Sequence, residues 1–152
     1  MGTTDSALTI AANLCRHFEG FSSKPYLCPA GYWTIGYGTV YKPDGTQVTK
    51  DDAPISKVTA NEWLLHELRT NYMAGVLRAS PVLAADANAL AAMTDFAYNL
   101  GVGRYRASAL RKRVEAEDWE GAKEQLMRWV RGGGRVLPGL VRRRKAEVAL
   151  LG

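Results

Sequence analysis

Apolar residues recur every three or four positions near the start of the chain, which is the spacing of one face of an α-helix. The residues on this face are Ala7, Ile10, Ala11, Leu14, Cys15 and Phe18. Gly20 follows them, and glycine commonly ends helices. The pattern predicts an amphipathic helix from about Thr4 to Gly20, with Glu19 in its last turn.

Between about Tyr26 and Thr49 the pattern changes to short β-like runs. The runs are GYWTIGYGTVY and TQVT, separated by the turn-rich segments PAG and KPDG. We expect an antiparallel meander of two or three strands. In an extended strand Thr34, Gly36 and Gly38 would share one face, and glycine in a strand often marks a close approach to the backbone. That face is either the floor of a cleft or a twisted hairpin weakened by glycine.

A second helical pattern follows in TANEWLLHELRTNYMAGVLRAS. Thr59 and Glu62 have the spacing of a capping box, and apolar residues after them recur at helical intervals. Pro81 cannot continue a helix, so the end is expected near Ser80. We expect one long helix over residues 59–79.

The chain from Asp86 to Leu151 reads as helical segments separated by GVG, RGGG and LPG. The first segment, ANALAAMTDFAYNLG, is rich in alanine and has few charges, which is typical of a helix surrounded by others. Trp119 and Trp129 lie at helical spacing from apolar neighbours. This spacing favours core packing for both rings over a sugar-binding platform.

Together these patterns predict an α+β fold that is mainly α. We expect one domain over residues 1–152, in which a small lobe with the β-meander (1–58) and a helical lobe (80–152) are joined by the long helix (59–79). The 47% hydrophobic and 23% charged residues are typical of a soluble globular protein. No run approaches the roughly 18 apolar residues of a membrane span, so we expect no stable membrane insertion.

Charge is distributed unevenly along the chain. The net charge is +5, yet the segment from Arg104 onward holds 13 of the 20 Lys and Arg residues and only six of the 15 acidic residues. A basic half favours a polyanionic partner, which could be nucleic acid, a membrane surface or an anionic cell wall. Charge alone does not choose among these partners.

The remaining features of the sequence argue against a signal peptide, a disulfide and a metal site. The first 15 positions contain no Lys or Arg, and Asn13 interrupts the apolar segment, so no signal peptide is predicted and synthesis in the cytoplasm is expected. Cys15 and Cys28 lack zinc-ligand spacing, and reduced thiols are expected, with a disulfide between them as the alternative. His17 and His66 have no partner at ligand spacing, so we expect no metal and no cofactor.

Glu19 is a single carboxyl group with Phe18 and Phe21 beside it. Both the negative end of the helix dipole and desolvation by these rings favour the protonated form of a carboxyl group. A general acid must be protonated before it can act. The alternative is an ordinary solvated residue at a helix end.

Eight residues separate Glu19 from Cys28, and five separate Cys28 from Thr34, which opens the run TIGYG. This set resembles the catalytic signature of bacteriophage lysozymes, the muramidase endolysins of glycoside hydrolase family 24, in which Glu, eight residues, Asp or Cys, five residues and Thr follow one another. The similarity continues through FAYNLGVGRYRASALRK (96–112), DWEGAKEQLMRWV (118–130) and GGGRVLPGLVRRRKAE (132–147). It therefore covers nearly the whole chain in order.

The resemblance implies a two-lobed lysozyme-like fold and hydrolysis of the β-1,4 bond between N-acetylmuramic acid and N-acetylglucosamine in peptidoglycan. Glu19 would protonate the leaving glycosidic oxygen, and Thr34 would orient the attacking water. Cys28 holds the second position, and a thiol with an ordinary pKa of about 8.5 stabilises an oxocarbenium ion less well than Asp unless that pKa is lowered. The resemblance suggests inversion at the sugar, while a covalent route through sulfur stays open.

The resemblance also suggests which other residues contact substrate. The suggested sugar contacts are Val40, Tyr98, Asn99 and Ser108, although Tyr98 could equally be a core residue. One arginine of RRRK (142–145) is expected to reach toward the catalytic Glu, without any indication of which one. Many relatives have His at the position of Thr39, and since that His looks structural we expect altered lobe packing here, with the chemistry retained.

An endolysin would act as a monomer on bacterial peptidoglycan and lyse the host cell. It would stay in the host cytoplasm until a holin breaches the membrane, and would then reach the periplasm and cell wall. Two other classes compete: a nucleic-acid-binding module built on the basic half, and a cationic wall-binding or membrane-disrupting protein without catalysis. The first lacks any helix-turn-helix, zinc or RNP-like signature, so no nucleic-acid partner is expected. The second has no need of an acid at a helix end.

Overall fold

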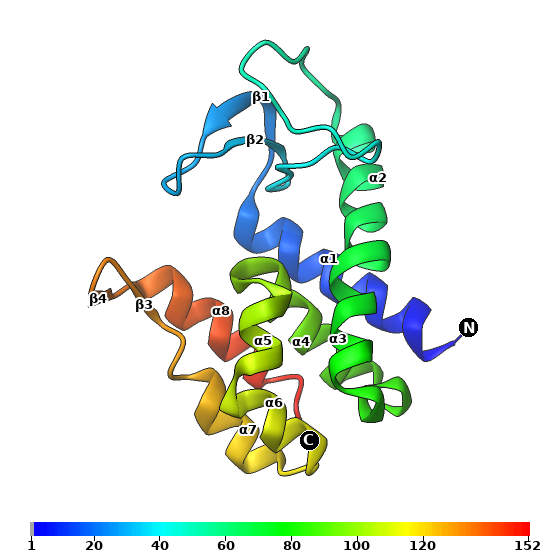
Figure 1. Cartoon of the computed structure of the whole chain (residues 1–152), viewed down its shortest axis with the longest axis vertical. Coiled ribbons are helices and arrows are strands. Elements are labelled where there is room, and N and C mark those ends of the chain that lie inside the picture. The colour runs from blue at the N-terminus through cyan, green and yellow to red at the C-terminus, as the bar shows by residue number, and fades with distance from the viewer. Residues whose placement is uncertain (1) are drawn as a thin grey trace.

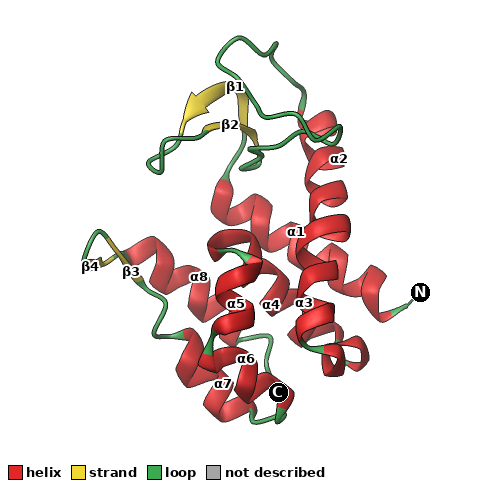
Figure 2. Cartoon of the chain, in the orientation of Figure 1, coloured by secondary structure: helices red, strands yellow, loops and turns green. Residues whose placement is uncertain are grey.

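The computed structural model describes residues 2–152. A small β-hairpin lies at one end of the molecule, several helices gather at the other end, and a long helical element runs alongside both (Figures 1 and 2). The fold is α+β and mainly α, which confirms the predicted class.

Helix α1 (Thr3–Glu19) follows the predicted amphipathic pattern. Ala7, Ala11 and Cys15 on its apolar face are buried. Gly20 ends the helix with φ of 73°, and its N–H donates to the carbonyl of Arg16. Because this backbone conformation favours glycine, the chain turns sharply here and leaves Glu19 at the helix terminus.

The β-structure begins earlier than predicted. Strand β1 (Ser22–Leu27) pairs antiparallel with β2 (Trp33–Gly36), which places Tyr26 opposite Thr34. The run TQVT contributes only an isolated bridge, from Gln47 to Tyr41. The meander is therefore a two-stranded hairpin followed by a long loop.

The prediction of one extended strand running on past Gly36 is wrong. Gly36 and Gly38 have φ of 66° and 86°. These left-handed conformations reverse the chain, so that Ile35 forms a bridge with Thr39 two residues beyond Tyr37. Side chains after Gly36 therefore do not follow the two-residue alternation of a strand.

The long helix has three parts: α2 (Lys57–Glu67), a π-helical segment η1 (Leu68–Met73) and α3 (Ala74–Ala79). Its end at Ser80 agrees with the prediction, and Pro81 opens the short 3₁₀ helix η2 (Pro81–Ala85). The predicted capping box at Thr59 is wrong. The N-cap is Ser56, whose hydroxyl accepts a hydrogen bond from the N–H of Thr59.

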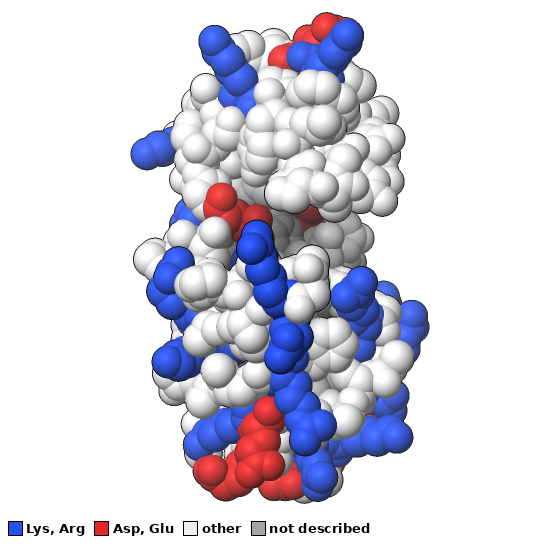
Figure 3. Space-filling view, turned by 90° about the vertical axis from the view of Figure 1, so that its left-hand side faces the viewer, with Lys and Arg blue, Asp and Glu red and all other residues white. Residues whose placement is uncertain are grey.

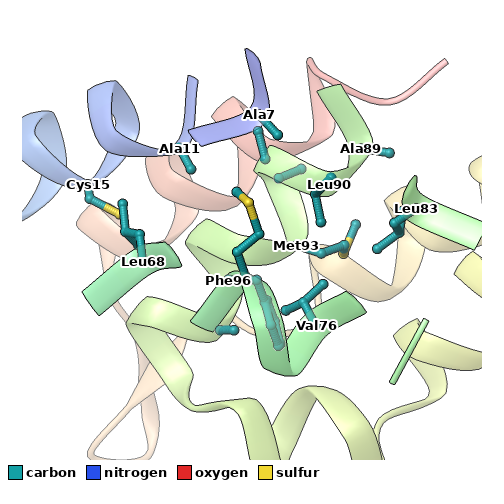
Figure 4. Close-up of a cluster of buried hydrophobic side chains, with 14 of the residues drawn as sticks. Ala7, Ala11, Cys15, Leu68, Val76, Leu83, Ala89, Leu90, Met93 and Phe96 are labelled. Carbon is teal, nitrogen blue, oxygen red and sulfur yellow. The ribbon is translucent and has the colours of Figure 1, made fainter. Parts of the chain in front are cut away.

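Helix α4 (Ala87–Leu100) lies at the centre of the helical part, and every residue from 89 to 97 is buried. It packs against α1, η1 and α8, as its composition predicted. Figure 4 shows its residues Leu90, Met93 and Phe96 among side chains of α1 and the long helix. Trp119 and Trp129 both pack against this core, which agrees with the packing role predicted for them.

The rest of the helical part surrounds α4. Its elements are α5 (Val102–Ala107), α6 (Ala109–Glu115), α7 (Trp119–Leu126), the short strands β3 (Arg131–Gly132) and β4 (Arg135–Val136), and α8 (Pro138–Val148). The β3–β4 hairpin was not predicted, because its glycine-rich sequence was interpreted only as a break between helices. Within residues 2–152, no helix combines the length and apolar character needed to cross a bilayer.

A buried ion pair joins α4 to α8. The fully buried Asp95 accepts hydrogen bonds from Nε and Nη2 of Arg143 at 2.9 and 2.8 Å, and from the thiol of Cys15 at 3.3 Å. Burial opposes ionisation of Asp95, but hydrogen bonds from Glu147 and Arg143 together with the Arg143 charge lower its pKa below the ordinary value. Burial raises the pKa of the neighbouring Glu147 well above its ordinary value, although the charges of Arg144 and Arg143 oppose the rise.

We predict that Asp95→Asn destabilises the fold strongly, because it leaves Arg143 without its buried counter-charge. Loss of one partner of a buried ion pair costs about 3–5 kcal/mol. Since the pKa of Asp95 is lowered by folding, its contribution is present above the unfolded pKa of about 3.9 and is lost as the pH falls further. Urea unfolding of the variant and the wild type over a pH series measures both effects.

Glu120→Gln is the matched control, because Glu120 pairs with Lys123 at the surface and is 82% exposed. This change should alter the unfolding free energy by at most about 1 kcal/mol. Equal stability of Asp95→Asn and wild type at neutral pH would contradict the role given to the buried pair.

Candidate active site

Glu19, at the end of α1, is held by Arg143 of α8. Its Oε2 accepts a hydrogen bond from Nη1 of Arg143 at 2.7 Å, while the other guanidinium nitrogens bind Asp95. The Arg143 side chain is 5% exposed and that of Glu19 is 23% exposed. The carboxyl group is therefore fixed on one side and remains accessible on another. Arg143 is the arginine of RRRK that reaches Glu19, and the sequence argument about Glu19 did not include this ion pair.

The loop that follows the β-hairpin approaches Glu19 at Gly38. A Cβ atom on Gly38 would lie 2.9 Å from Oε1 of Glu19. Side-chain atoms do not pack this closely, so the position requires glycine for space as well as for its φ of 86°. The predicted close approach to the backbone is confirmed at Gly38, whereas Gly36 faces α2, where its Cβ would lie 3.1 Å from that of Ala60.

Cys28 and Thr34 lie together on the hairpin. The N–H of Cys28 donates to the carbonyl of Tyr32, and the buried Thr34 hydroxyl donates to the same carbonyl at 3.0 Å. Hydrogen bonds to the sulfur, chiefly from the backbone of Tyr32 and also from Ala30, the Thr34 side chain and Gly31, lower the pKa of Cys28. More of this thiol is ionised near neutral pH than of an unperturbed cysteine.

Tyr26 lies on the same hairpin as Cys28 and Thr34. It lies opposite Thr34 in the hairpin. Burial raises its pKa, and the negative charges of Glu19 and Cys28 raise it further. The pKa of Tyr26 therefore depends on the charge of both groups.

Two cavities lie near Glu19, which lines the first of them. The first, of about 580 Å³, lies within the helical part and is lined by His17, Phe18, Glu19, Asn99, Leu137, Gly139, Leu140, Arg142 and Arg143. The second, of about 610 Å³, lies between the hairpin and the helices and is lined by Ala30, Tyr32, Gly38, Val40, Tyr41, Glu67, Tyr72, Leu100, Gly101 and Arg104. Gly38 lines the second cavity and touches Glu19. Figure 3 shows a hollow between the part of the molecule at the top and the helical part below it.

The four suggested sugar contacts differ in whether they line one of the two cavities. Val40 lines the second cavity, and Asn99 lines the first, where its Oδ1 accepts a hydrogen bond from Arg144. Tyr98 lines neither of these cavities. Its hydroxyl donates to the carbonyl of Tyr37 at 2.7 Å, so it connects α4 to the hairpin.

Ser108 also lies away from both cavities. It is buried at the N-cap of α6, where its hydroxyl donates to the carbonyl of Tyr105 and accepts from the N–H of Arg111. Its hydrogen-bonding capacity is used by the helix start. The structure therefore brings Val40 and Asn99 to the cavities and does not bring Tyr98 or Ser108 there.

Sequence reasoning missed Glu67, which lines the second cavity from α2. It is buried, and burial raises the pKa of Glu67 to about 7, although the neighbouring Thr39 side chain opposes the rise. From sequence alone, a single Glu in a helix is expected to lie at the protein surface. The substitution of Thr at position 39 was the one available signal for an unusual environment here.

The two cysteines are both free thiols, and the disulfide alternative is not formed in the structure. Cys15 is buried against Asp95, and burial raises its pKa well above the ordinary value. In the part of the chain that the structure describes, no group of three His, Cys, Asp or Glu side chains is arranged to hold a metal ion.

Comparisons with known proteins agree with this geometry. Residues 16–147 match the family model described as phage lysozyme. The endolysin of Acyrthosiphon pisum secondary endosymbiont phage 1 is 32% identical over 148 residues, which cover 90% of this chain and 91% of that protein. The endolysin of Bacillus phage PZA is 33% identical over 142 residues, and the match covers 91% of this chain but 52% of that longer protein.

Among solved structures, the endolysin from Escherichia coli O157:H7 phage FAHEc1 has a TM-score of 0.80 and 27% sequence identity. The alignment covers 93% of this chain and 90% of that chain. The similarity therefore extends over the hairpin, the long helix and the helical part together.

We predict that Gly38→Ala is more destabilising than Gly45→Ala. Both glycines have a left-handed φ, of 86° and 87°, so both variants incur the same backbone strain of about 1–2 kcal/mol. Only the Cβ at position 38 also collides with Glu19, whereas nothing lies within 4 Å at position 45. Overpacking of this kind adds about 1–3 kcal/mol. Chemical unfolding of the two variants measures the difference, and equal losses would show that the hairpin does not press against Glu19.

Proposed function

The chain belongs to the phage lysozyme family, and from this membership we infer that it is a phage endolysin, a lysozyme that cleaves bacterial peptidoglycan. We propose that the bond hydrolysed is the β-1,4 bond between N-acetylmuramic acid and N-acetylglucosamine. The observation that carries the proposal is the position of Glu19. It lines a cavity, is held by Arg143, and lies next to Gly38, just beyond the hairpin that bears Cys28 and Thr34.

In this proposal Glu19 is the general acid. Arg143 occupies Oε2, so Oε1, beside Gly38, is the oxygen that carries the proton to the leaving glycosidic oxygen. Because Arg143 is itself held by Asp95, the carboxyl group keeps one orientation during the reaction. Positioning of this kind lowers the barrier by removing the need to orient the acid in each turnover.

Cys28 and Thr34 act on water in the second half of the reaction. The lowered pKa of Cys28 supports a thiolate that accepts a proton from water, and the Thr34 hydroxyl orients that water. The water oxygen bonds to the anomeric carbon while the bond to the leaving oxygen breaks, and Glu19 supplies the proton that the leaving oxygen takes up. The configuration at the sugar is inverted, and exchange of protons with solvent restores both groups.

The basic half suits an anionic cell wall. Lys and Arg side chains gather on the helical part of the face in Figure 3. Arg143 and Arg144 are buried and bound to carboxylates, so they do not contribute to this surface. Exposed charges of this kind raise the rate of encounter with a polyanion, and salt weakens their effect.

We propose further that the protein acts as a monomer and reaches the wall from the host cytoplasm once a holin has breached the membrane. Lysis of expressing Gram-negative cells only after chloroform treatment would support this order of events. Spontaneous lysis without a breach would contradict it.

Glu19→Gln tests the proposed acid. The amide keeps the shape of the side chain but cannot donate the proton, and general acid catalysis contributes about 10²- to 10⁴-fold in rate. We expect release of reducing ends from purified peptidoglycan to fall by at least the lower factor. The exposed Glu62→Gln serves as the control and should keep wild-type activity. If folded Glu19→Gln kept more than about a third of the activity, Glu19 would not be the acid.

Cys28 variants test the second position. Cys28→Asp should keep or raise activity, because Asp supplies a full negative charge at neutral pH, whereas Cys28→Ala should lose most of it. A thiol-blocking reagent should inhibit the wild type and spare Cys28→Asp. The buried Cys15 should react slowly, since burial raises its pKa. Full activity of Cys28→Ala, unaffected by alkylation, would reduce Cys28 to a packing residue.

A further inference from the structure

The second cavity combines aromatic side chains with a single exposed cation. Tyr32 and Tyr41 line it from the hairpin and are 49% and 53% exposed, and Tyr72 and Leu100 line it from the helical side. Ligand sites usually present such apolar walls with a few polar groups that fix orientation. The polar groups that carry charge here are Glu67 and Arg104.

Glu67 and Arg104 differ in how available each is to bind a ligand. Glu67 is 7% exposed, and burial raises its pKa to about 7, so near neutral pH much of it is uncharged. Arg104 is exposed, and no ion pair among residues 2–152 includes it. By contrast, Arg111, Arg113, Arg143 and Arg144 each bind a carboxylate. The cavity therefore offers a guanidinium group that lacks a carboxylate partner.

The backbone that carries Arg104 is firmly placed. The neighbouring Tyr105 is fully buried, and its hydroxyl forms a 2.8 Å hydrogen bond with that of Ser80. Val102, at the start of α5, packs so closely on α3 that a Cβ on Gly75 would lie 2.8 Å from it. Arg104 thus belongs to a short helix that is anchored at Val102 and at Tyr105, and it lines the cavity.

The first cavity is a poorer place for an anion. It also contains an exposed arginine, Arg142, but the carboxyl group of Glu19 lines the same space. A negatively charged ligand there would be repelled by Glu19 whenever Glu19 is ionised. Arg104 in the second cavity has only the buried Glu67 as an acidic neighbour among the lining residues.

We propose that Arg104 binds a carboxylate on the muramic acid units of the substrate, so that the second cavity receives the part of the glycan strand that carries muramic acid. This inference rests on the proposed function. N-acetylglucosamine has no carboxylate, whereas muramic acid has a lactyl group whose carboxyl is either free or joined to a stem peptide with carboxylates of its own. Both sources present the same group, which a guanidinium binds through two parallel hydrogen bonds.

Binding measurements in the Glu19→Gln background test the assignment without turnover. The probes are a chitooligosaccharide without carboxylates, glycan fragments stripped of peptide by an amidase, and fragments that keep their stem peptides. Arg104→Gln should weaken binding of a carboxylate-bearing probe about three- to tenfold, as expected for a solvent-accessible charged pair. It should leave binding of the chitooligosaccharide unchanged, and Arg104→Lys should retain part of the affinity.

Arg106→Gln is the matched control, because it removes the same charge from the same helix. Arg106 is exposed and lines neither cavity. Weaker binding of both stripped and intact fragments by Arg104→Gln would assign the lactyl carboxylate, and weaker binding of intact fragments alone would assign the stem peptide. The inference is overturned if Arg104→Gln and Arg106→Gln behave alike with every probe, or if Arg104→Gln weakens the chitooligosaccharide equally. Failure of the wild type to release reducing ends from peptidoglycan would instead reject the proposed function.

Discussion

The structure depends on one guanidinium group that holds two carboxyl groups. Arg143 binds the buried Asp95 with two nitrogens and Glu19 with the third, and so it ties α1, α4 and α8 together. Transfer of these charges out of water is costly, and the cost is offset only when geometry and hydrogen bonding are good. The same requirement that stabilises the interior therefore fixes the orientation of Glu19, which lies at the border between the core and the open cavities.

The hairpin completes the site through two contacts with the helical part. Gly38 presses against Glu19, and the carbonyl of Tyr37 accepts a hydrogen bond from Tyr98 of α4. Both contacts are made directly after strand β2, which carries Thr34 and pairs with β1. Tyr98, suggested as a sugar contact, thus anchors the chain next to the hairpin.

The helices could be predicted largely from sequence because their signals are local. The apolar periodicity of α1 and its end at Gly20, and the alanine-rich character of α4, are properties of short segments. Glu19, Cys28 and Thr34 were proposed as site residues from their spacing, which matches that of a known family. Local signals could not show which arginine of 142–145 faces inward, because that depends on how α8 packs. They also failed where glycine reversed the chain after Gly36. The suggestion of Ser108 came from the resemblance, and in the structure its hydroxyl caps helix α6.

A thiol in the second position makes the chemistry depend on the hairpin backbone. An Asp at this position would be ionised at neutral pH without help, whereas Cys28 relies on hydrogen bonds from its own turn, chiefly from Tyr32, to lower its pKa. The carbonyl of Tyr32 in turn accepts hydrogen bonds from the N–H of Cys28 and from Thr34. The turn between β1 and β2 therefore sets the charge of the sulfur and the orientation of the threonine together. Because Gly38, just beyond the same hairpin, lies against Glu19, the proposed acid and the proposed water-activating group both depend on this part of the chain, and a change in its backbone is expected to affect both.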